Sequence, residues 1–344
     1  MIVKNESHVI QRCLRSVKPY IDSYSISDTG STDNTMELIR EELAGIPGVL
    51  TSDPWKDFAT NRNIALQGVR GDWVFSIDAD ETFEIDGRSL VIDPKTDLYW
   101  VQIREKSTVF WRQNIFRNDG RWHYQNPIHE ALCCDGSFTE GQLEGAWINT
   151  YYDSARNQAG GKAESDLAVL EKEPRTARTL FYLGQLYLNL GRLPEAEAMY
   201  RQRSTMGGWD EEVYFSLYEV GHIAAALGKP LHEAAGALYA AYTFRPHRLE
   251  ALVELCALLR TNQRYQESYN LSLISPPRST DLMFVNPHSE WMLLDEHGLA
   301  AYYLDKKDEA REYFLRVARY DLPASDRERT QMNLSYCPVE LSIS

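Results

Sequence analysis

The feature of this sequence that most constrains its fold is a repeat in the second half of the chain. A small residue followed by an apolar run recurs at Gly184, Gly221 and Cys256, so the copies are 37 and 35 residues apart. A fourth copy, "HGLAAYYLDKKDEA" at 297–310, follows a longer gap that contains the loop sequence "ISPPRSTD". This period, with helical apolar spacing in each copy, predicts stacked pairs of helices, because one pair is too small to bury its apolar face alone.

These repeats resemble those of the tetratricopeptide family, and unrelated helical hairpins are the alternative interpretation. We therefore predict an all-α, tetratricopeptide-like helical repeat domain over residues 160–344. Its concave face is expected to present a protein, peptide or glycan acceptor. A scaffold or homodimerisation surface is the competing hypothesis.

Residues 1–155 follow a different pattern, in which short β-like runs alternate with helical stretches. We expect strands at 21–27 and 72–78 and helices at 32–45 and 58–69. Such alternation implies right-handed βαβ crossovers and a mostly parallel sheet. Ligands of these sheets bind beyond the carboxyl ends of the strands. Asp28 and Asp78 fall at such ends, so the sequence predicts a binding site around them.

The composition excludes several classes of function. A formal net charge of −14 and a pI near 5.1 argue against a broad nucleic-acid or anionic-membrane surface, because such binding needs clustered Lys and Arg. No run approaches the ~18 uncharged apolar residues of a membrane-spanning helix. The charged start "MIVKNESHVIQRCL" does not read as an export signal. The five cysteines form neither a CxxC motif nor a disulfide framework, so we expect a reducing, cytoplasmic location.

The stretch "WVFSIDADET" at 73–82 ends an apolar run in three acids, Asp78, Asp80 and Glu81. Each of these acids raises the cost of ionising its neighbours, so a cation is expected among them. Two carboxylates, with a diphosphate and water, commonly hold Mg²⁺ or Mn²⁺ in nucleotide enzymes. We therefore expect a metal at Asp78 and Asp80, with Glu81 as a structural partner for a nearby N–H or arginine. A solvated acidic turn is the alternative.

Two further stretches combine groups that bind polar ligands. In "SISDTGSTDNT" (25–35), Asp28 closes a strand before a helix start, which suits a phosphate or a polar ring edge. A capping turn without a ligand explains that stretch equally well. "WRQNIFRNDGRWHYQNPIHEAL" (111–132) is rich in arginines, which grip anions bidentately, and nearly ends in His129 and Glu130. We expect a metal ligand and a base from that pair, whereas aromatic packing in a β-hairpin explains the tryptophans.

Taken in chain order, five motifs resemble the family 2 inverting glycosyltransferases of the GT-A fold, in the branch whose short catalytic domain precedes tetratricopeptide repeats. The motifs are "MIVKNESHVIQRCLRSV", "SDTGSTDNT", "WKDFATNRNIAL", "GDWVFSIDADE" and "FRNDGRWHYQNPIHEAL". The resemblance implies an α/β GT-A domain, Rossmann-like with a mostly parallel sheet, over residues 1–155. In that family several strand residues precede the first motif. We therefore expect a short first strand and an incomplete or borrowed wall of the base pocket.

The resemblance also implies which residues hold the nucleotide. The loop at Lys4, Asn5 and Glu6 would flank it. Asp28 would accept a hydrogen bond from the base, with uracil as the usual case. Arg62 would line the nucleotide or diphosphate site.

The metal site and the base follow from the same resemblance. Asp78 would face the ribose and the metal, and Asp80 would ligate the metal. His129 and Glu130 match the "HE" near the end of the family's catalytic domain, so His129 is expected at the metal and Glu130 as the catalytic base.

The predicted function is therefore a metal-dependent, inverting glycosyl transfer. Mn²⁺ or Mg²⁺ would assist in moving a hexose from a nucleotide sugar, such as UDP-glucose, to a hydroxyl or similar nucleophile of a protein, peptide or glycan. A catalytically inactive sugar-nucleotide-binding or scaffold protein is the alternative. A nucleotidyl or phosphoryl transferase is disfavoured, because the sequence has no GxxxxGK[ST] phosphate loop.

Overall fold

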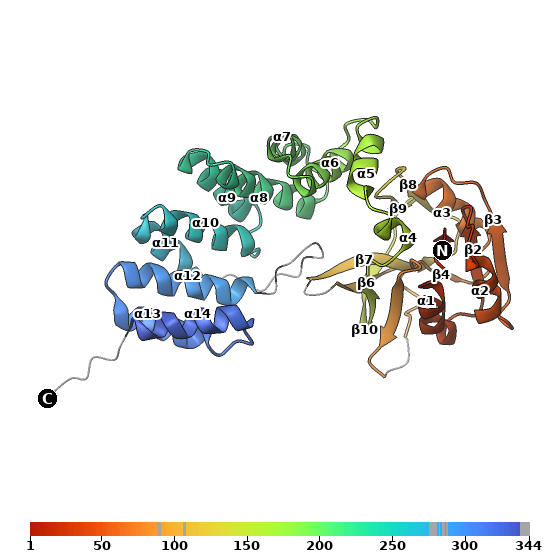
Figure 1. The fold of residues 1–344 in the computed structure, drawn as a ribbon, viewed down its shortest axis with the longest axis horizontal. Coiled ribbons are helices and arrows are strands. Elements are labelled where there is room, and N and C mark those ends of the chain that lie inside the picture. The colour runs from red at the N-terminus through yellow and green to blue at the C-terminus, as the bar shows by residue number, and fades with distance from the viewer. Residues whose placement is uncertain are drawn as a thin grey trace. The chain divides into compact units, whose positions relative to one another are not determined.

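The computed structural model describes residues 1–87, 91–105, 108–274, 281, 283, 286 and 288–337. The chain divides into two compact units, Met1–Glu173 and Pro174–Ser344, which are described separately (Figure 1). The predicted α/β class of the first and the helical-repeat class of the second are confirmed. None of the described helices is long and apolar enough to cross a membrane.

The first unit contains a parallel three-stranded sheet in the order β1-β2-β3. Its strands and the helices that contribute to its core are β1 (Ile2–Val3), β2 (Tyr24–Asp28), β3 (Gly48–Ser52), α1 (Ile10–Val17) and α2 (Thr35–Glu42). The core includes Ile10 and Leu14 from α1, Ile26 from β2 and Ile39 from α2, all at most 3% exposed. The first strand has two residues, which confirms the expectation that it is short.

A second, five-stranded sheet in the same unit runs in the order β4-β7-β6-β10-β5. Its strands are β4 (Trp73–Phe75), β5 (Glu81–Ile85), β6 (Leu98–Glu105), β7 (Thr108–Arg117) and β10 (Glu140–Thr150). Only β6 and β10 pair in parallel among the described strands of this sheet. The mostly parallel pairing predicted from sequence therefore holds for the three-stranded sheet but not here. The reason is that β6 and β7 follow one another along the chain and pair as a hairpin.

Helix α3 (Phe58–Gln67) follows β3 of the first sheet and precedes β4 of the second. It packs against β2 and against β8 (Trp122–Gln125). Asp57 is its N-cap residue, and the Asp57 carboxylate accepts a hydrogen bond from the Thr60 N–H at 2.7 Å. The Asn63 side chain accepts from the Tyr124 N–H at 2.7 Å and donates to its carbonyl at 2.9 Å. These two bonds hold α3, and with it the neighbouring Arg62, beside β8.

The remaining elements of the first unit are the single-turn helix η1 (Lys18–Tyr20), β9 (Ala131–Cys134), which completes the hairpin with β8, and two helices after β10, α4 (Ala155–Gln158) and α5 (Lys162–Leu170). The compact unit ends at Glu173, so it contains α5, whereas the sequence-based division lay at 155–160.

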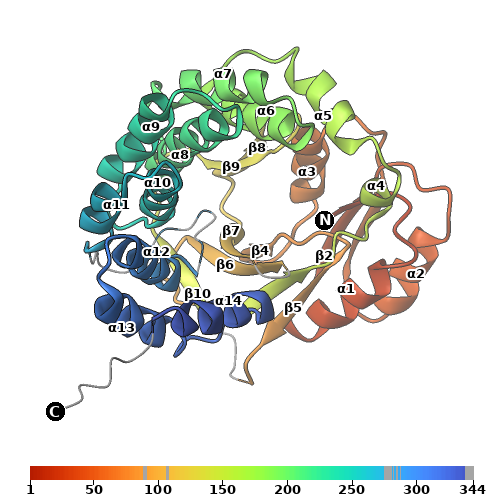
Figure 2. The same ribbon diagram turned by 60° about the vertical axis from the view of Figure 1, so that its left-hand side comes forward.

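The second unit is built from consecutive antiparallel helix pairs, which Figures 1 and 2 show in succession. Its described helices are α6 (Ala177–Asn189), α7 (Leu193–Ser204), α8 (Asp210–Ala226), α9 (Leu231–Phe244), α10 (Glu250–Thr261), α11 (Tyr265–Ser272), α12 (Ser289–Tyr303), α13 (Lys307–Val317) and α14 (Ala324–Ser335). The pairs α6–α7, α8–α9, α10–α11 and α12–α13 coincide with the four sequence copies.

Two of these small residues, Gly184 and Gly221, lie where the helices of a pair approach closely. A β carbon at Gly184 would lie 2.8 Å from the Tyr200 ring, and one at Gly221 would lie 2.6 Å from the Leu238 side chain. Such distances are shorter than van der Waals contact, so a β carbon at Gly184 or Gly221 would force the neighbouring helix or its side chain to shift. The repeat detected in the sequence therefore marks the helix contacts of the unit.

Candidate functional site

Asp28 ends β2 with a carboxylate that is only 1% exposed. Its Oδ1 accepts hydrogen bonds from the N–H groups of Gly30 at 3.0 Å and Ser31 at 2.9 Å. Its Oδ2 is buried and has no hydrogen-bond partner among the described residues. Buried polar atoms are normally paired, so this oxygen marks a place for a ligand N–H.

The loop that carries Asn5 is tied to the turn after Asp28. Asn5 donates its N–H to Ser31 Oγ at 2.9 Å, and its Oδ1 accepts from the Thr32 N–H at 2.7 Å. Asn5 has a backbone φ of 57°, a left-handed conformation that asparagine tolerates better than most residues. The next residue, Glu6, donates its N–H to Thr35 Oγ1 at 2.8 Å. Two predicted nucleotide-binding segments, distant by sequence, are therefore joined.

A series of ion pairs links five charged side chains, which come from α3, the segment after β4, the start of β5, the middle of β7 and the loop between β8 and β9. Arg62 Nε lies 2.5 Å from Glu130 Oε1, and Arg62 Nη2 lies 2.7 Å from Asp78 Oδ1. Beyond Asp78, Arg112 Nη1 lies 3.7 Å from Asp78 Oδ2, and Arg112 Nη2 donates to Glu81 Oε2 at 2.7 Å. The signs alternate, so each guanidinium is held between two carboxylates.

This arrangement determines the protonation of its acids. Burial raises the pKa of Asp78, but Arg62 and Arg112 outweigh it and lower that pKa to about 2. Burial raises the pKa of Glu81, and Arg112 opposes that rise. Glu81 Oε2 also accepts from the Asp78 N–H at 3.0 Å, which confirms the structural role predicted for Glu81.

Asp80 and Glu6 both face the amino end of the segment that follows β10. Asp80 Oδ2 accepts long hydrogen bonds of 3.4 Å from the Ser154 N–H and the Asn157 amide, while Glu6 Oε2 accepts from the Ala155 N–H at 3.2 Å. Burial raises the pKa of Glu6 to about 6, although the Ala155 N–H lowers it.

The same segment is anchored by an ion pair that sequence reasoning did not find. Arg12 on α1 donates to both carboxylate oxygens of Asp153, at 2.9 and 2.7 Å, and His8 Nε2 lies 2.7 Å from the Asp153 carbonyl. The Arg12 guanidinium also lies 4.1 Å from the centre of the Tyr151 ring. No motif in residues 151–157 announces these contacts, because they join residues about 140 positions apart.

The loop between β8 and β9, which carries His129 and Glu130, has an unusual backbone conformation at two of its residues. Asn126 has a φ of 75° and His129 a φ of 51°, both in the left-handed region that costs a residue with a side chain about 1–3 kcal/mol. Such conformations cluster at functional sites, and Asn5 supplies a third example. The loop turns Glu130 back onto Arg62, so the predicted base meets the predicted diphosphate residue.

Comparison with known proteins gives two matches that cover most of the chain between them. Residues 1–134 match a family model described as Glycosyl transferase family 2. A TPR repeat-containing protein of Synechococcus elongatus is 30% identical over 298 residues, which cover 78% of this chain and 72% of that protein. This chain is a glycosyltransferase with a family 2 domain at residues 1–134.

Other relatives match a smaller share of this glycosyltransferase. The SPbeta prophage-derived glycosyltransferase SunS of Bacillus subtilis is 22% identical, over 54% of this chain and 47% of that protein. The lipopolysaccharide core biosynthesis glycosyltransferase LpsC of Rhizobium meliloti is 33% identical, over 40% of this chain and 57% of that protein. The chain therefore spans about half the length of these two relatives. Among solved structures, the TPR protein YrrB aligns over 52% of the chain and 84% of its own length, with 15% identity and a TM-score of 0.38.

Members of this family generally use a nucleotide-sugar donor and a divalent cation. Within the described residues, no group of three or more His, Cys, Asp or Glu side chains is arranged to hold a metal. The predicted trio of Asp78, Asp80 and His129 therefore does not form a preassembled cage. Asp80 still fits a cation, because its weak 3.4 Å bonds leave carboxylate lone pairs available. Mg²⁺ and Mn²⁺ sites of this kind take one or two carboxylates and complete their shell with substrate phosphate and water.

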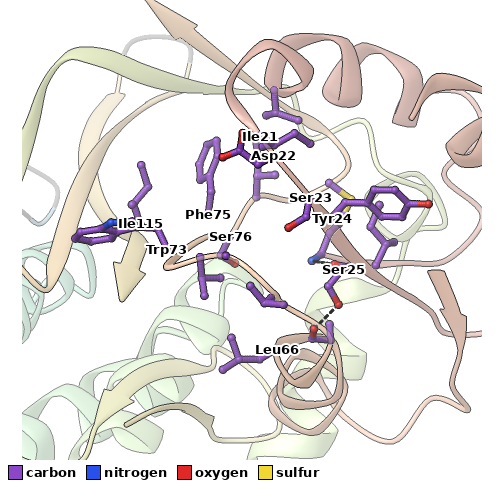
Figure 3. A pocket seen from close by; sticks show the side chains of 18 of the residues that line it. Ile21, Asp22, Ser23, Tyr24, Ser25, Leu66, Trp73, Phe75, Ser76 and Ile115 are labelled. Carbon is purple, nitrogen blue, oxygen red and sulfur yellow. Dashed lines mark hydrogen bonds between the residues drawn. The ribbon is translucent and has the colours of Figure 1, made fainter. Parts of the chain in front are cut away.

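A cavity of about 340 Å³ in the first unit has Arg62 among its lining residues. Figure 3 shows it between residues 21–25, at the amino end of β2, and Trp73, Phe75 and Ser76 of the β4 region. Asp28, Asp78 and Asp80 are not among its lining residues. Since ligands of such sheets bind at the carboxyl ends of the strands, we do not assign the donor to this cavity.

Proposed function

We propose that this family 2 transferase moves a hexose from a UDP-sugar, such as UDP-glucose, to a hydroxyl or similar nucleophile of a protein, peptide or glycan. The observation that carries the proposal is the unpaired Oδ2 of Asp28. Leaving a buried acceptor without a donor costs about 1–3 kcal/mol, which a ligand N–H recovers on binding. Uracil presents one ring N–H on its pairing edge, which would donate to Asp28 Oδ2. Asn5 and Glu6 would flank the nucleotide.

The diphosphate of the donor belongs at Arg62 in this proposal. Arg62 is 12% exposed in its side chain and lies between two acids, so its guanidinium is already oriented for planar anions. Asp80 would hold the divalent cation, with Asp78 and His129 as the further ligands predicted from sequence. When bound, Mn²⁺ or Mg²⁺ would neutralise the negative charge that develops on the departing diphosphate.

Glu130 is the proposed catalytic base. The acceptor oxygen bonds to the anomeric carbon while the bond from that carbon to the diphosphate oxygen breaks, and its electron pair leaves with the diphosphate. The hydroxyl proton passes to the Glu130 carboxylate, which lies within the ion-pair series at the donor site. A single displacement with no covalent intermediate inverts the anomeric configuration.

The helical repeats are proposed to hold the acceptor. Support comes from the tetratricopeptide-like architecture, whose stacked helices create an extended binding surface. Homodimerisation or scaffolding through the same helices is the alternative. The five cysteines are all free, which supports the proposal of a reducing, cytoplasmic setting.

Replacing Asp28 by Asn tests the donor assignment. The amide oxygen retains the bonds from Gly30 and Ser31, while the amide N–H₂ faces the N–H of the base, so two donors oppose each other. UDP affinity, measured by isothermal titration calorimetry with MnCl₂, should fall at least about tenfold. The exposed Asp72→Asn is the matched control and should bind UDP normally. Unchanged UDP affinity in Asp28→Asn contradicts the proposal.

A further inference from the structure

We propose that the second unit binds the ammonium group of a peptide lysine where α8 and α10 adjoin, at the carboxylates of Glu219 and Glu254 (Figure 2). The inference rests on the proposed function, because it takes from there that the repeats hold the acceptor. It adds the chemistry that the repeats would recognise, which is a basic side chain of a peptide.

His222 on α8 links the two helices in an accessible position. Its Nδ1 lies 2.8 Å from Glu254 Oε1 on α10, and its ring stacks on the Tyr218 ring with the ring centroids 6.1 Å apart. The side chains of His222 and Glu254 are 48% and 23% exposed, so a ligand can reach both from solvent. Neighbouring repeats therefore contribute one group each to the same place.

Glu219 is the member of this cluster whose charge is least compensated. It is 7% exposed, and its Oε2 is buried without a hydrogen-bond partner among the described residues. Burial raises the pKa of Glu219 to about 7, Glu254 adds to that rise, and His222 opposes it. Buried carboxylates normally have a donor or a cation, so this oxygen marks a place for a donor that the chain does not supply.

A second unpartnered group lies near the first. The Tyr200 hydroxyl on α7 is buried and has no hydrogen-bond partner in the part of the chain that the structure describes. Burial raises the pKa of Tyr200, and the Glu219 carboxylate raises it further, an effect that requires the two groups to be close. An ammonium carries three N–H donors, so one bound cation can serve several oxygens of this region.

The charge of the cluster favours a cation as the ligand. Glu219 and Glu254 share one imidazole, and among the described residues no lysine or arginine contributes to the pKa of Glu219 or of His222. The three side chains do not converge on one point as the ligands of a metal ion do, again within the described residues. We therefore assign the missing charge to an organic cation.

Lysine suits this position better than an amine on a sugar ring. Its ammonium lies at the end of a flexible four-carbon stem, which can reach a recessed carboxylate such as that of Glu219. The exposed His222 ring can rotate away and leave Glu254 to the ammonium. The adjacent Tyr218 ring would then add a cation–π contact.

Saturation-transfer difference NMR on the full chain tests the inference without any turnover. The probe is the capped peptide Gly-Ser-Gly-Lys-Gly-Ser-Gly, titrated at pH 8, where Glu219 is mostly ionised. The matched control peptide carries acetyl-lysine, which has no positive charge. We expect the lysine peptide to bind at least about fivefold more tightly than the control, as for one charged contact that is partly shielded from water.

Four variants locate the binding. Glu254→Gln should weaken binding of the lysine peptide at least about fivefold, and Glu219→Gln should weaken it as well. His222→Asn should tighten it, because the imidazole no longer competes for Glu254. The exposed Glu233→Gln on α9 removes one negative charge from the same unit and should bind the peptide normally.

Equal affinity for the two peptides overturns the inference, as does unchanged binding in Glu254→Gln or unchanged or weaker binding in His222→Asn. Tighter binding of a glucosamine trimer than of the lysine peptide would assign the site to an amine-bearing glycan and overturn the peptide assignment. If Glu254→Gln does not fold, Glu219→Gln decides, because it removes a buried charge that has no donor. All variants should bind UDP as the wild type does. Failure of the folded wild-type protein to bind UDP contradicts the proposed function instead.

Discussion

Glu6 offers a prediction about how the stability of the first unit depends on pH. Glu6 is 7% exposed, and burial raises the pKa of its carboxyl group from 4.5 to about 6. A carboxyl group with a raised pKa in the folded state stabilises the protein below its unfolded pKa, and that contribution is lost as the pH rises through the folded pKa. The rise from 4.5 to about 6 corresponds to about 2 kcal/mol of unfolding free energy.

Glu6→Gln should therefore stabilise the first unit by about 2 kcal/mol at pH 7.5 and change it little at pH 4. The amide oxygen can still accept from the Ala155 N–H, so the hydrogen bond is retained. The assay is urea unfolding followed by pulsed hydrogen exchange, which reports on peptides of the first unit separately. Glu41→Gln, on the exposed face of α2, is the control and should show no such pH dependence. Equal unfolding free energies for Glu6→Gln and wild type at pH 7.5, or an equal gain at both pH values, would refute the reasoning.

Three further predictions concern packing, an ion pair and the metal. Gly221→Ala places a β carbon 2.6 Å from a leucine side chain and should destabilise the repeats by about 1–3 kcal/mol in urea unfolding, whereas Gly236→Ala meets no atom within 4 Å and should not. Arg112→Gln leaves the buried Glu81 without its guanidinium and should lower the unfolding free energy by about 3 kcal/mol; an unchanged urea midpoint contradicts the ion-pair account. Asp80→Ala should abolish metal-dependent donor turnover with an unchanged circular dichroism spectrum, and near-normal turnover would reassign the metal.

Local sequence patterns were sufficient for several elements, including the strand end at Asp28 and the helix pairs of the repeat. Asp28 was expected at a strand end before a tight turn, and it ends β2 with its carboxylate held by that turn. The small residues of the repeat were recognised because each copy repeats the same close helix contact, as at Gly184 and Gly221. Both are signals carried by neighbouring residues, which is why a sequence can display them.

The contacts that fix the site could not be found in this way. The Arg62–Glu130 pair joins residues 68 positions apart, and the bond from Ala155 to Glu6 joins residues 149 positions apart. Arg112 lies in the stretch 111–132, whose arginines were expected to grip anions, yet it pairs with Glu81, because strand β7 carries it to the start of β5. Such pairings depend on strand order, which the alternating pattern of the sequence does not encode when antiparallel strands are inserted.

The central claim, an inverting hexosyl transfer from a UDP-sugar, is tested most directly by the configuration of the product. UDP-glucose, whose sugar is α-linked, is incubated with the protein and MgCl₂, and the hydrolysis catalysed in the absence of an acceptor is followed by proton NMR. The account predicts that β-glucose forms first and that Glu130→Gln suppresses its formation. First-formed α-glucose, or no turnover of UDP-glucose or any other UDP-hexose by the folded protein, would contradict the account.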